Sequence, residues 1–151
     1  ELVTGIDIVK AQFMIAAGES IAVTQNDITL SGHAIECRIN AEDPSRNFMP
    51  SPGRVSSLIL PGGPGVRVDT ALFAGCDVPP HYDSLIGKVA VWGRDRTEAI
   101  ERMARALDEI EIEGVSTNVA FQRRLIGSSR FRNAAIYCDD DVLALVTGDE
   151  P

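Results

Sequence analysis

The alternation of hydrophobic and polar residues divides this chain into a helical start, a strand-rich middle and a helical end. Near the N-terminus apolar residues recur at steps of three to four, at Ile6, Val9, Phe13 and Ala17. This spacing predicts a helix from about residue 6 to residue 17, with one apolar stripe. The segment from Thr4 to Asp7 resembles a capping box at its start, and Gly18 fits a left-handed stop at its end.

A strict alternation predicts the first strand, from Ala34 to Asn40. Its apolar residues, Ile35, Cys37 and Ile39, point one way, and its polar residues point the other way, namely Glu36, Arg38 and Asn40. Further strands are expected over residues 55–60, 66–69 and the mostly apolar run 85–92. Glycine- and proline-rich turns separate them.

Helical periodicity returns after residue 94, where Asp95 to Glu98 repeats the capping pattern. Apolar residues at steps of three, four and three predict a helix with one buried face, formed by Ile100, Met103, Leu107 and Ile110. Glu101 and Arg105 lie four residues apart, so we expect an ion pair on the exposed face.

A short strand over residues 111–115 and a last helix to about Ile126, capped by Ser116 or Thr117, complete the predicted elements. The acidic tail from Asp139 onward is expected to fray. Strands gathered in mid-chain with helices around them indicate an α+β fold.

Composition narrows the possible partners. The 151 residues suit one domain, and 22 acidic against 14 basic residues give a net charge of −8, which argues against nucleic acid. No window approaches the roughly 20 apolar residues that span a membrane. The N-terminus has no signal-peptide pattern and no initiator Met, so we expect a fragment of a longer protein.

The cysteines predict neither a disulfide framework nor a metal site. Cys37, Cys76 and Cys138 are odd in number and widely spaced, and no C-x-x-C motif occurs. A reducing compartment is therefore the expectation.

The polar strand face is the best candidate for chemistry. An arginine between a carboxylate and an amide can hold a carboxylate or bicarbonate with two hydrogen bonds, or stabilise an oxyanion. Glu36, Arg38 and Asn40 provide this arrangement. On the pattern alone, a solvated strand face with cross-strand pairs is the more frequent interpretation.

Two other segments have features of functional sites. His81 to Ser84 precedes a buried strand and could line a site, or could form a turn in which Asp83 and Ser84 bond the local backbone. Gly62 to Gly65 is no phosphate loop, because it lacks the Gly-Lys-Ser/Thr ending and precedes a strand.

Five segments, in order and with natural spacing, resemble biotin carboxylases. Residues 32–44 are similar to the signature G-H-A-x-E-x-R-x-x-A-E-D-P, and residues 48–53 to the loop F-x-P-S-P-G. The other three are similar to P-G-G-x-G-V-R, Y-D-S-x-x-x-K and G-x-x-T-N, at residues 61–67, 82–88 and 114–118.

This resemblance implies the C-terminal domain of a biotin carboxylase over residues 1–151, a small barrel-sandwich flanked by helices, without the ATP-grasp and N-terminal domains. The family carboxylates carrier-bound biotin from bicarbonate through carboxyphosphate, in acetyl-CoA, propionyl-CoA and pyruvate carboxylases. The implied cofactors are biotin, ATP and Mg²⁺, with ATP and Mg²⁺ held mainly by the absent domains. The implied partners are a biotin carboxyl carrier domain, a carboxyltransferase and a second copy, in a cytoplasmic ligase such as that of fatty acid biosynthesis.

The resemblance also assigns roles to residues. Arg38 matches the arginine that contacts bicarbonate and the biotin ureido oxygen, and Arg67 falls in a segment similar to the family's homodimer interface. Four residues are expected to orient or shape the site around Arg38, namely Glu36, Asn40, Tyr82 and Asp83. The alternative is a non-catalytic dimerisation or binding module with the same fold.

Overall fold

The computed structural model describes residues 1–135, so the prediction for the acidic tail lies outside the described residues. The helices are α1 (Ile8–Ala16), α2 (Arg96–Asp108), α3 (Val119–Gly127) and α4 (Ser129–Arg132), with short 3-10 turns at Gln25–Asp27 and Pro44–Arg46. The longer strands are β1 (His33–Asn40), β6 (Val66–Thr70) and β8 (Leu85–Gly93). The shorter strands are β2 (Glu42–Asp43), β3 (Met49–Pro50), β4 (Gly53–Arg54), β5 (Ser57–Ile59), β7 (Asp77–Val78) and β9 (Glu111–Glu113).

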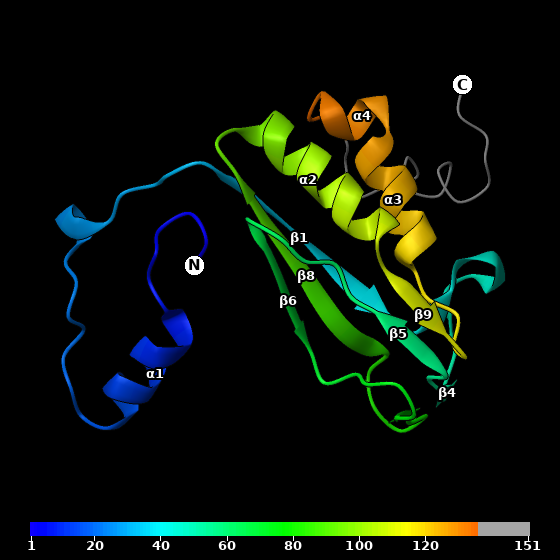
Figure 1. Ribbon diagram of the computed structural model, residues 1–151. Coiled ribbons are helices and arrows are strands. Elements are labelled where there is room, and N and C mark those ends of the chain that lie inside the picture. Colours follow the sequence, from blue (N-terminus) through cyan, green and yellow to red (C-terminus); the bar gives the residue numbers. More distant parts are fainter. Residues whose placement is uncertain (136–151) are drawn as a thin grey trace.

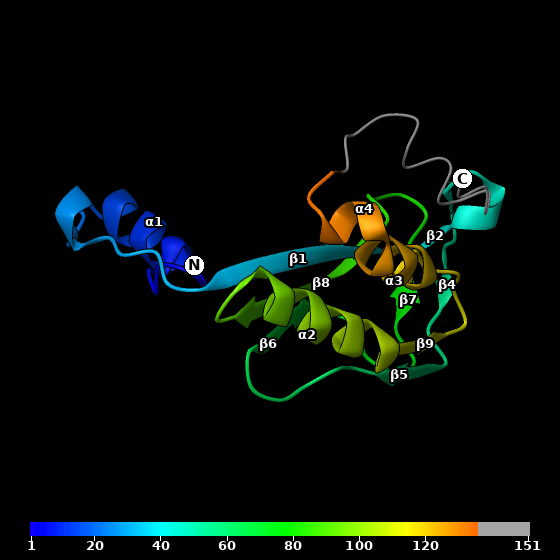
Figure 2. The same cartoon turned by 90° about the horizontal axis from the view of Figure 1, so that it is seen from above.

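The centre of the fold is an antiparallel sheet with the strand order β1-β8-β6. One face of this sheet is apolar and is covered by α2, with α3 and α4 beside it (Figure 1, Figure 2). The residues that meet between sheet and helices include Cys37, Ile39, Val89, Val91, Ile100, Met103 and Leu107. The predicted alternation of β1 is confirmed, and the predicted apolar face of α2 is confirmed for Ile100, Met103 and Leu107. Ile110 lies beyond the end of the helix and is partly buried against the same core.

Helix α2 begins where the sequence predicts. The Asp95 carboxylate accepts a hydrogen bond from the backbone N–H of Glu98 at 2.9 Å, which satisfies one free donor of the first turn. The predicted pair between Glu101 and Arg105 is wrong. Arg105 donates instead to Glu109, four residues along at the C-cap of the same helix, and to the Gly62 carbonyl. Glu101 accepts from Arg132, which α4 brings within reach.

Replacing Asp95 by alanine is expected to lower the free energy of unfolding by about 1 kcal/mol, because the Glu98 N–H loses its acceptor. Urea denaturation followed by circular dichroism measures this change. Asp95→Asn is the matched control, since an asparagine oxygen can still accept the bond. An equal loss in both variants would contradict the capping role.

A second, smaller core forms where the short strands meet. Val55 is fully buried there with Ala41 and Val78. Its N–H donates to the Cys76 carbonyl. The predicted strand 55–60 is present only over residues 57–59, as β5, which pairs with β9. The separate pair of β4 with β7 involves residues just before it. Within residues 1–135 no sheet closes on itself, so the structure supports an α+β domain without a closed barrel.

The N-terminal segment stands apart from this body (Figure 1). The N-cap of α1 is Asp7, which accepts from the Lys10 N–H, and the predicted start at the Thr4 box is wrong by one turn. The apolar stripe exists, yet no residue of α1 is buried, and Phe13 is 73% exposed. None of the helices in residues 1–135 has the length and apolar character needed to cross a membrane.

Candidate functional site

Strand β1 presents the predicted polar face on the side of the sheet away from α2. Glu36 and Arg38 are exposed there and Asn40 is half-buried, while Cys37 and Ile39 alternate into the core. Within the described chain the Arg38 side chain makes no ion pair or hydrogen bond. Its guanidinium is therefore available to an external anion.

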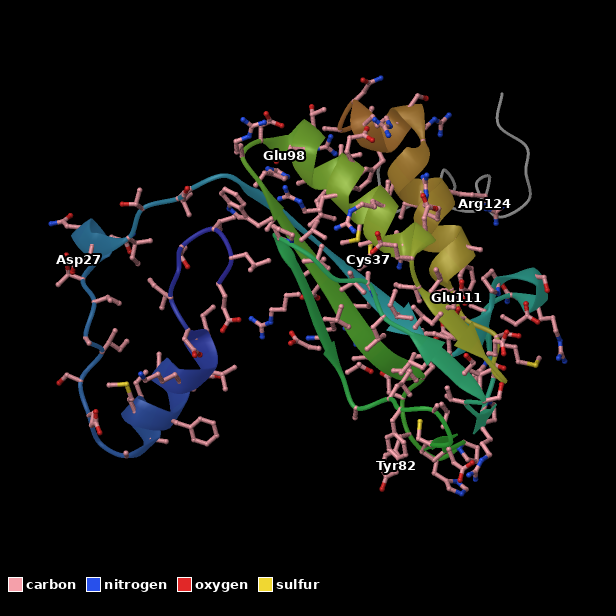
Figure 3. The ribbon with its side chains drawn as sticks, in the orientation of Figure 1. Asp27, Cys37, Tyr82, Glu98, Glu111 and Arg124 are labelled. Carbon is pink, nitrogen blue, oxygen red and sulfur yellow. The ribbon has the colours of Figure 1, made fainter. Side chains whose placement is uncertain are left out.

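Cys37 takes no part in this face. It lies between β1 and α2 (Figure 3), and burial, aided by the nearby Glu36 charge, raises the pKa of its thiol to about 12. Since only a thiolate is a strong nucleophile, this cysteine is inert at neutral pH.

The strand register places Lys88 of β8 directly opposite Arg38, and Asp69 of β6 directly opposite Lys88. Glu36 pairs in the same way with Ala90, which is opposite Arg67. The outward face therefore carries one row of three charged residues, Arg38, Lys88 and Asp69, and beside it a row in which Glu36 and Arg67 flank Ala90. Lys88 was not among the predicted site residues, although it is the one charged residue in the apolar run 85–92 and ends the Y-D-S-x-x-x-K motif.

Asn118 forms three hydrogen bonds to the backbone of β1 at Arg38 and Asn40. Its Nδ2 donates to the Arg38 carbonyl at 3.1 Å, and its Oδ1 accepts from the Asn40 N–H at 3.0 Å. Its own N–H donates to the Asn40 carbonyl at 3.1 Å. Asn118 is only 6% exposed, so its hydrogen bonds are shielded from water. They fix the end of β1, where the register with β8 shifts after Ile39.

This use of Asn118 corrects the predicted start of α3. Asn118 itself occupies the N-cap position, in place of Ser116 or Thr117, and its side chain makes no capping bond to the helix. Both of its side-chain polar atoms are already bonded to β1, 78 and 80 residues away. In the sequence Asn118 stands out only as part of the T-N motif, and no local pattern predicts its bonds to β1.

The Asn40 carboxamide is bonded to the following strand, β2. Its Nδ2 donates to Oε1 of Glu42 at 3.1 Å, and the Ser84 hydroxyl donates to the same oxygen. Asn40 Oδ1 is buried without a hydrogen-bond partner in residues 1–135. These contacts join the end of β1 to the start of β8, a network of Glu42 and Ser84 that the sequence pattern did not predict.

Tyr82 and Asp83 lie at the entrance to β8, and within the described residues neither forms a hydrogen bond or ion pair with Arg38. Tyr82 is 82% exposed and projects away from the sheet (Figure 3), and the Asp83 carboxylate accepts from the Leu85 N–H at 2.9 Å. The alternative expectation for this segment, a turn with local backbone bonds, is therefore met by Asp83 but not by Ser84, whose hydroxyl donates to Glu42. Both residues border a separate depression of about 580 Å³, beside Phe73 and Cys76.

A cavity of about 720 Å³ lies between the N-terminal segment and the outward face of the sheet. Its charged lining residues are Glu1, Glu36, Arg67, Asp69 and Lys88. Arg67 pairs with Asp69 at 3.0 Å and with Glu1 at 2.5 Å, and these hydrogen bonds raise the pKa of its guanidinium. Arg67 thus crosslinks the two walls of the cavity, and its predicted place in a dimer interface stays a prediction.

Comparisons with known proteins agree on one family. A family model described as the biotin carboxylase C-terminal domain matches residues 36–139. The biotin carboxylase of Nostoc is 52% identical over 131 residues, 87% of this chain, and that of Pseudomonas aeruginosa is 53% identical over the same share. This chain spans 29% of the length of each of those two relatives.

Solved structures give the same result for the fold. The biotin carboxylase domain of a thermophilic 2-oxoglutarate carboxylase bound to bicarbonate superposes with a TM-score of 0.93 at 40% identity, over 97% of this chain and 33% of the other. A dimer of the Hydrogenobacter thermophilus domain, in complex with MgADP, ADP and bicarbonate, gives 0.91 at 41% identity over the same shares.

Proposed function

The chain belongs to the biotin carboxylase C-terminal domain family, and from this premise we propose that it supplies Arg38 to the biotin and bicarbonate site of an intact biotin carboxylase. The intact enzyme carboxylates carrier-bound biotin from bicarbonate at the expense of ATP, through carboxyphosphate. The main support for the proposal is the exposed Arg38 side chain, whose guanidinium has no counter-ion in residues 1–135. The backbone at Arg38 and Asn40 is held in place by hydrogen bonds to Asn118.

Arg38 can act on the charge that develops during the reaction. Removal of the ureido proton from biotin leaves negative charge on the ureido oxygen, and a guanidinium already in position stabilises that charge without reorganising. Its two parallel N–H groups also fit the two oxygens of a bicarbonate or carboxylate. A counter-ion on Arg38 would weaken both interactions, and none is present within the described chain.

Neighbouring residues would support this role at different distances. Glu36 is one step along the same face and can tune the field around Arg38, while Asn40 holds the end of the strand through Glu42. Tyr82 and Asp83 would shape the rim of the site from the entrance to β8. For these four residues the roles rest on the family resemblance and on their positions.

The nucleotide and its metal ion belong elsewhere in the intact protein. In residues 1–135 no group of three His, Cys, Asp or Glu residues could hold a metal ion, so the described residues do not fit Mg²⁺. We assign ATP and Mg²⁺ to the parts of the relatives that lie outside the match. The proposed partners are the biotin carrier domain, a carboxyltransferase and a second copy, with Arg67 at the face between copies.

The intact protein that contains this chain is expected to cleave ATP only when bicarbonate is present and to carboxylate free biotin. The 151-residue chain alone is expected to do neither, because Arg38 without a nucleotide site cannot activate bicarbonate. Phosphate release and incorporation of labelled bicarbonate measure the two reactions. Bicarbonate-dependent ATP cleavage by the chain alone would refute the assignment of the nucleotide site to other parts of the intact protein. An inactive intact protein would favour a non-catalytic dimerisation or binding module.

A further inference from the structure

Two cationic residues face outward side by side at the proposed site. Arg38 and Lys88 are direct register partners across β1 and β8, and such side chains start about 4.5–5.5 Å apart at their Cβ atoms. Like charges in this position repel and destabilise the sheet. Neither side chain forms an ion pair anywhere in residues 1–135, so nothing in that part of the chain compensates the repulsion.

The acidic residues near Lys88 do not neutralise it. Asp69, its register partner on the other side, is bound to the Arg67 guanidinium at 3.0 Å. Glu36 is its diagonal neighbour across the strands and forms no salt bridge within the described part of the chain. Lys88 is also half-buried against the cavity, where a charge is solvated less well than on an open surface.

We propose that Lys88 binds, together with Arg38, a single small oxyanion of the bicarbonate class. An anion bound between the two side chains would offset their repulsion. It would also give Lys88 a counter-ion, which no neighbouring residue of the described chain provides. This inference rests on the proposed function of Arg38 and adds to it a second binding residue, on a different strand.

The surrounding charges select a small anion over a large one. Glu1, Glu36 and Asp69 line the cavity that Lys88 lines, and Arg67 is bound to Glu1 and Asp69 there. A polyphosphate that reached from Lys88 into this cavity would therefore meet three carboxylates offset by only one guanidinium. A monoanion the size of bicarbonate is short enough to stay between Arg38 and Lys88. The pair therefore fits bicarbonate better than it fits the phosphates of a nucleotide.

The sequence offers a matched control, because Lys10 and Lys88 are its only lysines. In the intact enzyme, Lys88→Met is expected to raise KM for bicarbonate about tenfold or more, as the loss of a charged hydrogen bond requires. KM for ATP should stay unchanged. Lys88→Arg should restore most of the affinity for bicarbonate, and Lys10→Met, on the exposed face of α1, should change neither constant.

The kinetics distinguish this inference from the proposal on which it rests. If Arg38→Ala abolishes carboxylation while Lys88→Met leaves KM for bicarbonate unchanged, the inference about Lys88 is overturned and the role of Arg38 stands. If both variants behave as wild type, the proposed function fails with it. Equal increases in KM for bicarbonate and ATP, or no rescue by Lys88→Arg, would indicate a structural role for Lys88 and overturn the inference.

Discussion

Replacing Arg38 by alanine in the intact enzyme is expected to lower the turnover number for biotin carboxylation about 100- to 1,000-fold, the usual loss when one donor to a developing oxyanion is removed. The guanidinium is exposed and has no ion pair in the described residues, so its removal leaves no buried charge behind. The loss should therefore fall on catalysis and leave folding intact. Incorporation of labelled bicarbonate into biotin measures it, and nucleotide titration checks that ATP binding survives.

Two further variants sharpen this test. Arg38→Lys keeps the positive charge and loses the two-pronged geometry, so it should recover only part of the activity. Arg124→Ala removes an exposed arginine of α3 that makes no ion pair within the described residues, and it should leave turnover unchanged. Wild-type turnover in Arg38→Ala would show that the site lies elsewhere.

Replacing Asn118 by alanine is expected to lower the free energy of unfolding by about 1–3 kcal/mol. The change leaves the Asn40 N–H without the acceptor it has at 3.0 Å, whereas the Arg38 carbonyl loses its bond at 3.1 Å and keeps the longer one from Gln122 at 3.4 Å. One unsatisfied buried group costs about 1–3 kcal/mol. Urea denaturation of the chain measures the difference. Asn26→Ala, in an exposed 3-10 turn, is the matched control and should be close to neutral.

The same residue links stability to the site. Asn118→Asp keeps an acceptor for the Asn40 N–H and loses the donor to the Arg38 carbonyl, so it separates the two bonds. If the second bond positions Arg38, this variant of the intact enzyme should lose carboxylation activity under conditions in which it remains folded. Full activity in a folded Asn118→Asp enzyme would limit the residue to a structural role.

Local patterns predicted those parts of the molecule whose cause is itself local. The alternation of β1 assigned Arg38 to the outward face and Cys37 to the core, because successive side chains of a strand point to opposite sides. The cap at Asp95 and the buried face of α2 were predicted for the same reason, since both depend on residues within three or four positions. The candidate arginine came from this pattern and from the family motif together.

Two of the misses have the opposite property. Glu101 pairs with Arg132, 31 residues away, and Asn118 leaves its own helix uncapped to bind β1, 78 and 80 residues away. A spacing rule ranks only near neighbours, so it chose Arg105 as the ion-pair partner and Ser116 or Thr117 as the cap. Tertiary packing supplied other partners for Glu101 and Asn118, and Arg105 pairs with Glu109 instead.

The sequence by itself therefore determined which residues face outward, including the arginine proposed to carry the chemistry, because facing is set by backbone geometry over a few residues. Only the tertiary structure decided what surrounds that arginine. The register of β1 with β8 sets Lys88 beside it, and the packing of α3 sets Asn118 behind it. Both depend on pairing between distant segments, which the local alternation of residues does not encode.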